Sequence, residues 1–420
     1  MKISIIGTGY VGLITGVCFA ELGNNVICID INEEKVNKIN SGEPTIYERG
    51  LEEIFKKNLE RIKASLNFNE ILNTDITFIC VSTPENPDGS INLDYIKSAS
   101  ESVGKVLKEK GYHLVVVKST VVPETTEKVV IPILEKFSEK NVGEDFGVCM
   151  NPEFLKEGSA IKDFMEPDRI VIGEFDKKSG DMLFNLYKDF KCPILRTDLK
   201  TAEMIKYASN AFLSMKISFI NEMGNICKKL GINIYKVAEG MGYDERIGHK
   251  FLRAGPGFGG SCFKKDVNAL IKKAESLGYE PKILKSVLEV NERQPLKMIE
   301  LLKKYLQNLK NKKIGVLGLS FKPETDDIRE SPAIKIVKKL LEEEAIVNAY
   351  DPKAMNNFKK LFPNINYFSS AQDCIENSEA VLIVTDWDEF KDLDYSDKIV
   401  IDGRYIISKE KAKIYEGICW

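Results

Sequence analysis

The chain has 420 residues, of which 43% are hydrophobic and 29% are charged, and its net charge at neutral pH is −3. This length exceeds what one hydrophobic core usually organises, so we expect at least two domains, and the composition argues against intrinsic disorder. The balanced charge disfavours nucleic acid or an acidic membrane surface as the main partner, although it leaves room for a local anion site.

The histidines and cysteines exclude further classes of protein. Only His113 and His249 are present, without a second histidine at metal-ligand spacing, so a histidine-rich zinc site and a Ser-His-Asp triad are disfavoured. The nine cysteines include no Cys-x-x-Cys pair, which argues against a disulfide framework and a structural zinc site. No apolar run approaches the roughly 20 residues of a membrane-spanning helix, and the amino-terminal run has no signal-peptide pattern. We therefore expect a cytoplasmic protein without a bound metal or a membrane anchor.

The first part of the chain alternates short apolar runs with helical patterns. The expected strands are 2–6, 26–29, 76–81, 114–118, 146–150 and 170–173. A glycine-rich turn at 7–12 precedes a helix that reaches Leu22, and 33–63 has a helical pattern that breaks at 41–44. Strands that alternate with helices predict a doubly wound parallel sheet with helices on both faces.

A long helix and a second alternating block follow. Apolar residues recur at helical spacing from 201 to 230, and we expect this helix to join two halves of the chain and to take part in a dimer contact. The strands expected in the second block are 313–319, 346–350, 380–385 and 399–401. The predicted fold is α/β, with two Rossmann-like domains joined by a long central helix. The expected domains are 1–199, 200–298 and 299–420.

The turn after the first strand has the spacing of a dinucleotide-binding motif. Gly7, Gly9 and Gly12 allow a tight turn and a close approach of the backbone to a pyrophosphate at the start of a helix. Asp30 ends the second strand at the expected distance of about 20 residues, where a carboxylate accepts hydrogen bonds from ribose hydroxyls and repels a 2′-phosphate. The context predicts NAD as cofactor, and the alternative is a glycine turn without a ligand. The second block lacks this motif, so its ligand is expected to be a different phosphorylated molecule.

Cys262 differs from the other cysteines, most of which lie in apolar runs. It follows a loop with four glycines, 255–260, and precedes Lys264 and Lys265 ahead of a helical pattern. Backbone N–H groups and cationic neighbours lower the pKa of a thiol and favour a nucleophilic thiolate. The alternative is a phosphate-binding loop in which the cysteine is incidental.

Five segments together match one family of enzymes. They are 151–158, 206–222, 246–252, 257–266 and 321–332. The set extends over nearly the whole chain and resembles the UDP-glucose 6-dehydrogenases of the UDP-glucose/GDP-mannose dehydrogenase family. One departure is Lys264, where many relatives carry proline, which puts the stiffness of the loop in doubt but not the roles of Cys262 and Asp266.

The resemblance implies a four-electron oxidation of a primary alcohol to a carboxylate with two molecules of NAD. A base and NAD first remove a proton and a hydride, which gives an aldehyde. Cys262 then adds to the aldehyde as a thiohemiacetal, loss of a second hydride gives a thioester, and water hydrolyses it. Covalent capture retains the reactive aldehyde and creates the second hydride donor. The implied substrate is UDP-glucose and the implied product is UDP-glucuronate.

The resemblance also assigns individual residues. The implied catalytic residues are Cys262, Lys206, Asn210, Asp266, Thr120, Glu153 and Glu157. The implied NAD contacts are Gly7, Gly9, Tyr10, Val11, Gly12, Asp30, Lys35, Thr83, Thr120, Glu157, Lys265 and Arg329. The implied substrate contacts are Phe154, Leu155, Lys156, Glu157, Lys206, Asn210, Arg246, Phe251, Leu252, Arg253, Ala254, Gly255, Gly259 and Lys322.

Within these sets, Lys206 and Asn210 lie four residues apart on the predicted long helix and share one face, where they can stabilise oxyanions at the sugar C6. Without the family resemblance, a solvated lysine on an amphipathic helix is the simpler interpretation. Glu157 resembles a carboxylate that assists thioester hydrolysis and Glu153 resembles a helper, while helix capping or surface charge is the alternative for both. Thr120, with Asp266, resembles a pair that positions water.

Three other functions remain open. A dehydrogenase of another nucleotide sugar, either a UDP-N-acetylhexosamine or GDP-mannose, would use the same chemistry. A two-electron hydroxyacid dehydrogenase would need no nucleophilic cysteine, and a regulatory NAD-binding protein would have no turnover. The long helix, and the resemblance of Arg246 to a residue that reaches in from a neighbouring subunit, predict a homodimer.

Overall fold

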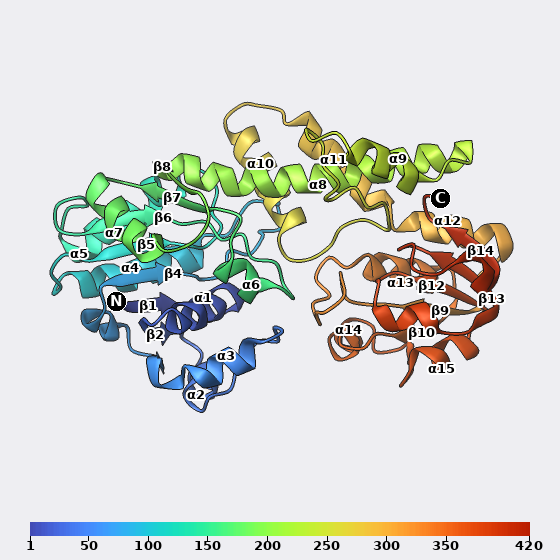
Figure 1. Ribbon diagram of the computed structural model, residues 1–420, viewed down its shortest axis with the longest axis horizontal. Coiled ribbons are helices and arrows are strands. Elements are labelled where there is room, and N and C mark those ends of the chain that lie inside the picture. Colours follow the sequence, from blue (N-terminus) through green and yellow to red (C-terminus); the bar gives the residue numbers. More distant parts are fainter. The chain divides into compact units, whose positions relative to one another are not determined.

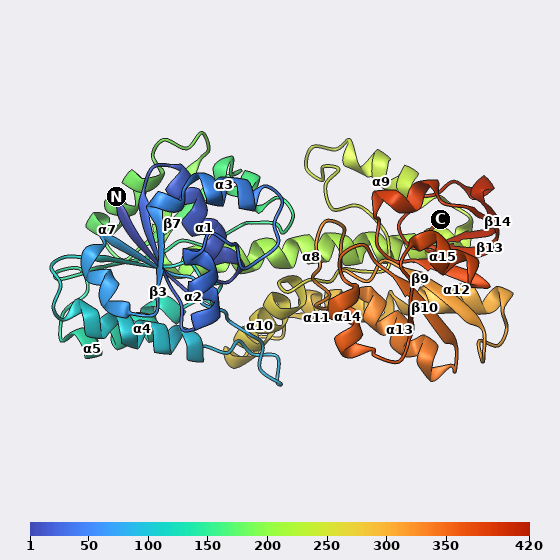
Figure 2. The same ribbon diagram turned by 90° about the horizontal axis from the view of Figure 1, so that it is seen from below.

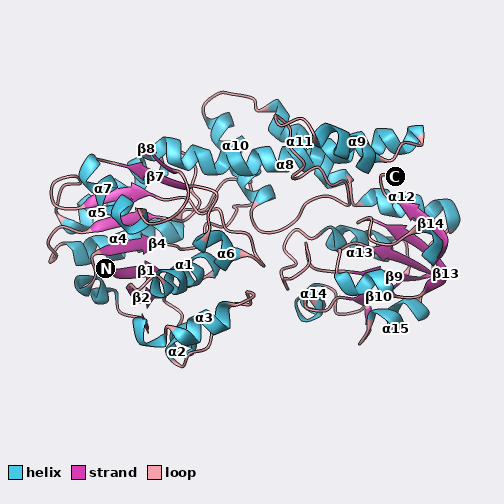
Figure 3. Cartoon of the chain, viewed as in Figure 1, coloured by secondary structure: helices cyan, strands magenta, loops and turns pink.

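The computed structural model describes residues 1–420, which divide into two compact units, Met1–Ser209 and Asn210–Trp420. Each unit contains one β-sheet with helices packed on it (Figure 1, Figure 3). Helix α8 (Leu199–Leu230) begins in the first unit and ends in the second. The predicted α/β class, with two Rossmann-like sheets and a long central helix, is confirmed.

The sheet of the first unit has eight strands in the order β3-β2-β1-β4-β5-β6-β7-β8. The strands are β1 (Lys2–Ile6), β2 (Asn25–Ile29), β3 (Ile62–Ser65), β4 (Ile76–Ile79), β5 (Leu114–Val117), β6 (Gly147–Met150), β7 (Ile170–Glu174) and β8 (Ile194–Asp198). All neighbouring strands are parallel except β6 and β7, which run antiparallel. The central strands are fully buried, as continuous apolar sequences predict for a parallel sheet.

Helices cover both faces of this sheet (Figure 2). They are α1 (Tyr10–Glu21), α2 (Glu33–Asn40), α3 (Leu51–Lys57), α4 (Asp94–Leu107), α5 (Ile131–Ser138), α6 (Ala160–Met165) and α7 (Lys177–Tyr187), with the short 3₁₀ helices η1 (Leu59–Arg61) and η2 (Phe68–Asn73) and the π-helix η3 (Thr126–Val130). Successive strand residues point to opposite faces, so Ile5 packs with α1 and α3 while Ile6 packs with α4 and α5. This alternation produces two cores, one on each face.

The sheet of the second unit has six parallel strands in the order β11-β10-β9-β12-β13-β14. The strands are β9 (Lys313–Leu317), β10 (Ile346–Tyr350), β11 (Asn366–Tyr367), β12 (Ala380–Ile383), β13 (Tyr395–Asp402) and β14 (Ala412–Gly417). The helices are α9 (Ile234–Gly242), α10 (Phe263–Ser276), α11 (Lys282–Arg293), α12 (Leu296–Tyr305), α13 (Pro332–Glu342), α14 (Met355–Leu361) and α15 (Ala371–Glu376), with turns η4 (Asp388–Asp392) and η5 (Lys409–Lys411). Ser331 caps α13 through the N–H of Ala333, and Pro332 occupies the first helical position.

The structure differs from the sequence prediction at the sheet edges. The strands β3, β8, β11 and β14 were not predicted. The helical pattern at 33–63 is wrong at the loop residues 45–50 and at the start of β3, whereas the predicted break at 41–44 lies in the observed loop. These are outer strands with polar and partly exposed residues, such as Arg196 and Thr197 in β8, so they lack a continuous apolar sequence. No helix combines the length and the hydropathy needed to span a lipid bilayer.

Candidate active site

The glycine turn of the first unit has the geometry of a dinucleotide-binding loop. Gly7 has a φ of 88°, and helix α1 begins at Tyr10 directly after Gly9. A Cβ atom on Gly12 would lie 1.9 Å from the carbonyl oxygen of Gly7, whereas one on Gly9 would meet no atom within 4 Å. Gly12 therefore permits close packing of the helix on the strand, and Gly9 leaves the turn open for a ligand.

A cavity of about 460 Å³ lies beside this turn and is lined by Gly7, Gly9, Asp30 and Lys35, among other residues. Oδ2 of Asp30 accepts hydrogen bonds from the N–H (2.7 Å) and the hydroxyl (2.6 Å) of Thr8. Burial would raise the pKa of Asp30, but these hydrogen bonds outweigh burial and hold the pKa below its usual range. The open turn and the ionised carboxylate fit the pyrophosphate and the ribose of NAD.

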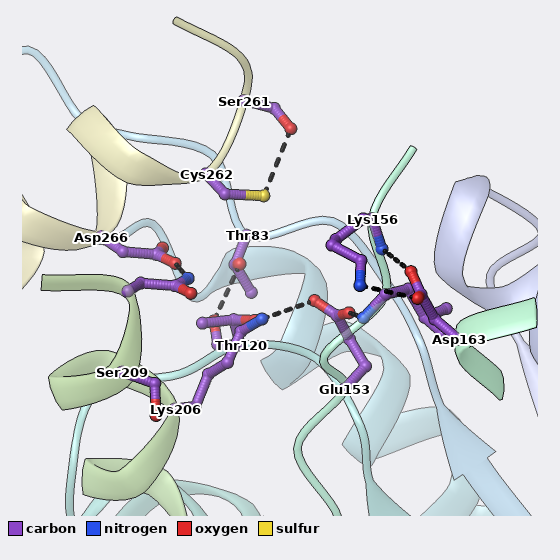
Figure 4. Close-up of polar contacts among 12 residues, drawn as sticks. Thr83, Thr120, Glu153, Lys156, Asp163, Lys206, Ser209, Ser261, Cys262 and Asp266 are labelled. Carbon is purple, nitrogen blue, oxygen red and sulfur yellow. Dashed lines mark hydrogen bonds and ion pairs between the residues drawn. The ribbon is translucent and has the colours of Figure 1, made fainter. Parts of the chain in front are cut away.

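Two further residues predicted to contact NAD lie together in the first unit. The hydroxyl of Thr83 donates a hydrogen bond of 2.9 Å to the carbonyl oxygen of Thr120 (Figure 4). Thr83 follows β4 and Thr120 follows β5, which are neighbours in the sheet. Their position agrees with the rule that ligands of parallel sheets bind beyond the carboxyl ends of the strands.

A buried ion pair joins helix α8 to the segment after β6. Nζ of Lys206 lies 2.9 Å from Oε1 of Glu153, whose other oxygen accepts the N–H of Leu155 at 2.6 Å (Figure 4). Burial would raise the pKa of Glu153, but the charge and hydrogen bond of Lys206 outweigh burial and hold the pKa below its usual range. The predicted catalytic residues Lys206 and Glu153 are therefore direct partners.

Lys118 extends this buried network, and sequence reasoning did not select it. Its Nζ donates a hydrogen bond of 2.9 Å to Oδ1 of Asn151, which also accepts the hydroxyl of Tyr187 at 2.8 Å. Burial lowers the pKa of Lys118 to about 8. The signal in the sequence was a lysine at the end of a continuous apolar strand, where solvation is poor.

Cys262 in the second unit is the only exposed cysteine of the nine. It occupies the N-cap position of α10, and its Sγ lies 3.5 Å from the hydroxyl of Ser261 (Figure 4). Five of the buried cysteines have pKa values raised to about 12, mainly by burial; these are Cys18, Cys28, Cys80, Cys374 and Cys419. The start of a helix is instead a position that favours a thiolate.

Asp266 lies one turn further along α10 and is 2% exposed. Its carboxylate accepts hydrogen bonds from the side-chain amide of Asn210 (2.7 Å) and from Nζ of Lys265 (2.6 Å). The N–H of Asp266 donates to the carbonyl oxygen of Cys262 at 2.8 Å. Three predicted site residues of the second unit are therefore hydrogen-bonded to one another, next to the cysteine.

Beside the glycine loop lies a cavity of about 210 Å³ within the second unit. Its lining includes the predicted residues Phe251, Arg253, Gly255 and Gly259. The loop backbone is held by three buried side chains: Asn221 accepts the N–H of Gly255, Asn291 bonds both backbone groups of Phe258, and Gln294 donates to the carbonyl of Gly255. The cavity thus combines a fixed backbone with aromatic rings and an arginine, which suits a nucleotide diphosphate.

Arg404 also lines this cavity and was not among the predicted residues. Its Nε donates to the carbonyl oxygen of Val384 at 2.6 Å, and its own carbonyl accepts Arg253 at 2.7 Å. Arg253 pairs with Asp386 at 2.6 Å. The sequence signal was the position of Arg404 after β13, at the carboxyl end of a parallel sheet.

Other predicted residues lie in different surroundings within the second unit. The side chain of Arg246 is 89% exposed and pairs with Asp244, and Arg329 pairs with Asp327. Nζ of Lys322 lies 5.5 Å from the centre of the ring of Phe321, which lines the cavity.

An NAD-binding Rossmann-like unit, and a glycine loop that presents a cysteine at a helix start, define an NAD-dependent dehydrogenase. Comparison with protein families matches residues 1–191 to the NAD binding domain, 200–293 to the central domain and 315–409 to the UDP binding domain of the UDP-glucose/GDP-mannose dehydrogenase family. The chain belongs to this family.

Individual relatives agree with this assignment. UDP-glucose 6-dehydrogenase AglM from Haloferax volcanii is 45% identical over 430 residues that cover 100% of both chains. The structure of a UDP-glucose dehydrogenase from Pyrobaculum islandicum is 45% identical, with a TM-score of 0.96 and coverage of 100% of this chain and 98% of that one. The structure of a UDP-D-ManNAc dehydrogenase from Pyrococcus horikoshii is 30% identical, with a TM-score of 0.89 and coverage of 100% and 99%.

Proposed function

We propose that the chain oxidises UDP-glucose to UDP-glucuronate in two NAD-dependent steps, with Cys262 as the nucleophile. The observation that carries the proposal is the exposed Cys262 at the start of α10, hydrogen-bonded through its backbone to the buried Asp266. The relatives that are 45% identical over the full chain are UDP-glucose dehydrogenases by name, which supports this sugar nucleotide over others.

The reaction consumes one primary alcohol, two NAD⁺ and one water. Loss of a proton and a hydride from the C6 alcohol gives the aldehyde. The thiolate of Cys262 adds to the aldehyde carbon to give a thiohemiacetal, and loss of a second hydride gives a thioester. Water then attacks the thioester carbon, the C–S bond breaks, and the carboxylate and the thiol of Cys262 are released. The cofactor accepts one hydride in each oxidation.

The chain's polar side chains have separate roles in this proposal. Lys206 and Asn210 stabilise the oxyanions that develop at C6. Thr120 and Asp266 position the attacking water, and Glu157 assists the removal of its proton. Glu153 acts through Lys206, because the buried ion pair between them fixes the position of the ammonium.

Binding of the ligands is divided between the units in the proposal. The cofactor contacts are those of the glycine turn with Asp30, Lys35 and Thr83, joined by Lys265 and Arg329. The nucleotide diphosphate occupies the cavity of the second unit, and Lys322 also contacts it. The division into residues 1–199, 200–298 and 299–420, and the cytoplasmic location, are kept as parts of this proposal.

We also propose a homodimer formed through α8. In the second unit this helix exposes Phe212 (57%), Phe219 (43%) and Ile226 (49%), which recur at intervals of seven residues. Such spacing places them in one apolar stripe, the arrangement of a helix that packs against a partner helix. The α8 helix of a second copy carries the same stripe. In the proposed pairing of the two helices, the exposed Arg246 of each copy lies at the neighbouring subunit.

A substrate panel with a count of NADH tests the function. Purified protein is incubated with limiting UDP-glucose, GDP-mannose or a UDP-N-acetylhexosamine and excess NAD⁺, and the absorbance of NADH is followed to completion. We expect UDP-glucose to give the highest kcat/KM, with two NADH per sugar. One NADH per sugar would exclude the thioester route. A preference for UDP-N-acetylmannosamine would instead support a UDP-N-acetylhexosamine dehydrogenase, the activity that the name of the 30% identical structure suggests.

A further inference from the structure

Glu48 is a buried carboxylate in the loop between α2 and α3 of the first unit. The residue is 6% exposed, and no prediction from the sequence gave it a role. A buried carboxylate is costly unless it is paired or hydrogen-bonded. The partners of Glu48 therefore indicate what its burial achieves.

Two of these partners are backbone groups of the segment after β6. Oε2 of Glu48 accepts the N–H of Gly158 at 2.7 Å, and Oε1 accepts the N–H of Ala160 at 3.0 Å. These residues lie 110 and 112 positions further along the chain. Gly158 has a φ of 82°, a conformation that favours glycine, so its N–H orientation is set by an uncommon backbone geometry.

The third partner belongs to the cofactor turn. The hydroxyl of Tyr10, the first residue of α1, donates to Oε2 of Glu48. Burial raises the pKa of Tyr10, and the negative charges of Glu48 and Glu157 raise it further, so the hydroxyl stays protonated and remains a donor. One carboxylate thus joins the turn that binds the pyrophosphate to the segment around residue 158.

The segment that Glu48 holds contains Glu157. On its amino-terminal side, the N–H of Lys156 donates to Asp163 at 2.9 Å, and Nζ of Lys156 pairs with the same carboxylate at 2.7 Å (Figure 4). On its carboxyl-terminal side, the N–H of Gly158 donates to Glu48, and the backbone of Gly158 also contacts the side chain of Tyr10. The backbone on both sides of Glu157 is therefore fixed by carboxylates, and only one of them reaches the cofactor turn.

We propose that Glu48 is a positioning residue that fixes the backbone of Glu157 relative to the cofactor turn. This inference rests on the proposed function, in which Glu157 contacts the cofactor and assists hydrolysis of the thioester. Glu48 acts through its bonds to Gly158 and Tyr10, and it does not touch the reacting atoms.

The test uses Glu48→Gln in the full-length protein, with Glu53→Gln as the matched control. A glutamine keeps the shape of the side chain, but its amide nitrogen cannot accept a hydrogen bond, so one of the backbone N–H groups loses its partner. Glu53 is an exposed carboxylate on the adjacent helix α3. The control removes the same charge from the same region without touching Gly158 or Tyr10.

Three measurements are made at a temperature at which circular dichroism shows both variants to be folded. For Glu48→Gln we expect kcat to fall about tenfold or more, since misplacing a group near the reaction by about 1 Å can cost about a hundredfold. We expect rapid mixing to show a burst of NADH before the steady state, because hydrolysis becomes slower than the oxidations. Calorimetry is expected to show NAD⁺ binding weakened by about fivefold, the scale of one ordinary hydrogen bond. Glu53→Gln should match the wild type in all three.

A folded Glu48→Gln protein with wild-type kcat, burst and NAD⁺ affinity would overturn the inference and leave Glu48 a role in stability only. If Glu48→Gln does not fold, Tyr10→Phe tests the inference. This variant removes the bond from Tyr10 to Glu48 but keeps the bonds of Glu48 to the backbone of Gly158 and Ala160. We then expect weaker NAD⁺ binding and a lower kcat, and wild-type values for both would contradict the inference.

Failure of the proposed function gives a different result. A wild-type protein that oxidises none of the nucleotide sugars overturns the proposed function, whatever Glu48 does. The calorimetric affinity for NAD⁺ still tests Glu48 in that case, because it needs no turnover.

Discussion

Lys206 and Glu153 form an ion pair of 2.9 Å in which the side chains are only 5% and 8% exposed. Removing one partner of a buried pair leaves the other charge poorly solvated. We expect Glu153→Gln to lower the free energy of unfolding by about 3 kcal/mol, measured by urea denaturation at pH 7. Glu166→Gln, which changes an exposed carboxylate of the same unit, should stay within about 0.5 kcal/mol of the wild type. Equal effects of the two variants would contradict the buried pairing.

Cys262 gives the most direct test of the chemistry. Cys262→Ala should reduce turnover at least about a thousandfold, as the loss of a nucleophile does in other enzymes, while calorimetry shows unchanged NAD⁺ binding. Cys262→Ser should leave a trapped or very slow intermediate, visible in the mass of the intact protein. Cys192→Ala changes a cysteine of the first unit and should keep wild-type turnover. Unchanged turnover in Cys262→Ala would contradict the assignment of Cys262 as the nucleophile.

Asp30 should determine the choice between NAD⁺ and NADP⁺. Asp30→Ala removes the carboxylate that is held by Thr8 next to the cofactor cavity. We expect the KM for NAD⁺ to rise about tenfold or more, the scale of a hydrogen bond to a charged group. The kcat/KM ratio of NADP⁺ to NAD⁺ should rise at the same time, because repulsion of a 2′-phosphate is lost. An unchanged ratio would show that Asp30 does not face the ribose.

Glu203 should make the stability of the first unit depend on pH. Burial raises its pKa to about 7 from a usual value of 4.5, although it accepts the N–H groups of Glu124 and Thr126. Between these values the folded protein binds more protons than the unfolded chain, so the contribution of Glu203 to stability falls as pH rises. We expect the unfolding free energy of the wild type, relative to that of Glu203→Gln, to fall from pH 5 to pH 8. A relative unfolding free energy that rises over this range would contradict the raised pKa.

The apolar stripe of α8 predicts the oligomeric state. Light scattering coupled to gel filtration should give the wild type twice the chain mass of 47.4 kDa. Phe219→Asp places a charge in the stripe and should give the mass of one chain. Leu277→Asp, at a 70% exposed apolar residue after α10, should leave the wild-type mass unchanged. A wild type with the mass of one chain would exclude the dimer.

The buried parts of the fold were predictable from the sequence because they depend on local patterns. Continuous apolar runs identified β1, β4 and β5, and the glycine spacing identified the turn before α1. The edge strand β3 was missed because its residues alternate between buried and exposed. A local sequence pattern gives no information on the contacts with distant residues that hold an edge strand in the sheet.

The residues of the candidate site were likewise predictable only where the signal is local in the sequence or belongs to a family motif. Cys262 was selected from its glycine-rich context, and a family resemblance named both Lys206 and Glu153, but their ion pair was not predicted. Glu48 could not be selected, because its burial depends on two N–H groups more than 100 residues away. Arg404 was not predicted, because its position after a strand is a weak signal that does not by itself show that the side chain lines a cavity.

The reversed direction of β7 decides which loops meet the segment after β6. In a fully parallel sheet, the residues that precede a strand lie at the edge away from the ligands. Because β7 is antiparallel to β6, Arg169, which precedes it, lies at the ligand edge, and its guanidinium stacks 3.7 Å from the centre of the ring of Phe154. The carbonyl of Val171 likewise accepts the amide of Asn151 at 2.8 Å. The inverted direction of β7, which β8 shares, therefore adds a further cationic residue to the surface beside Phe154.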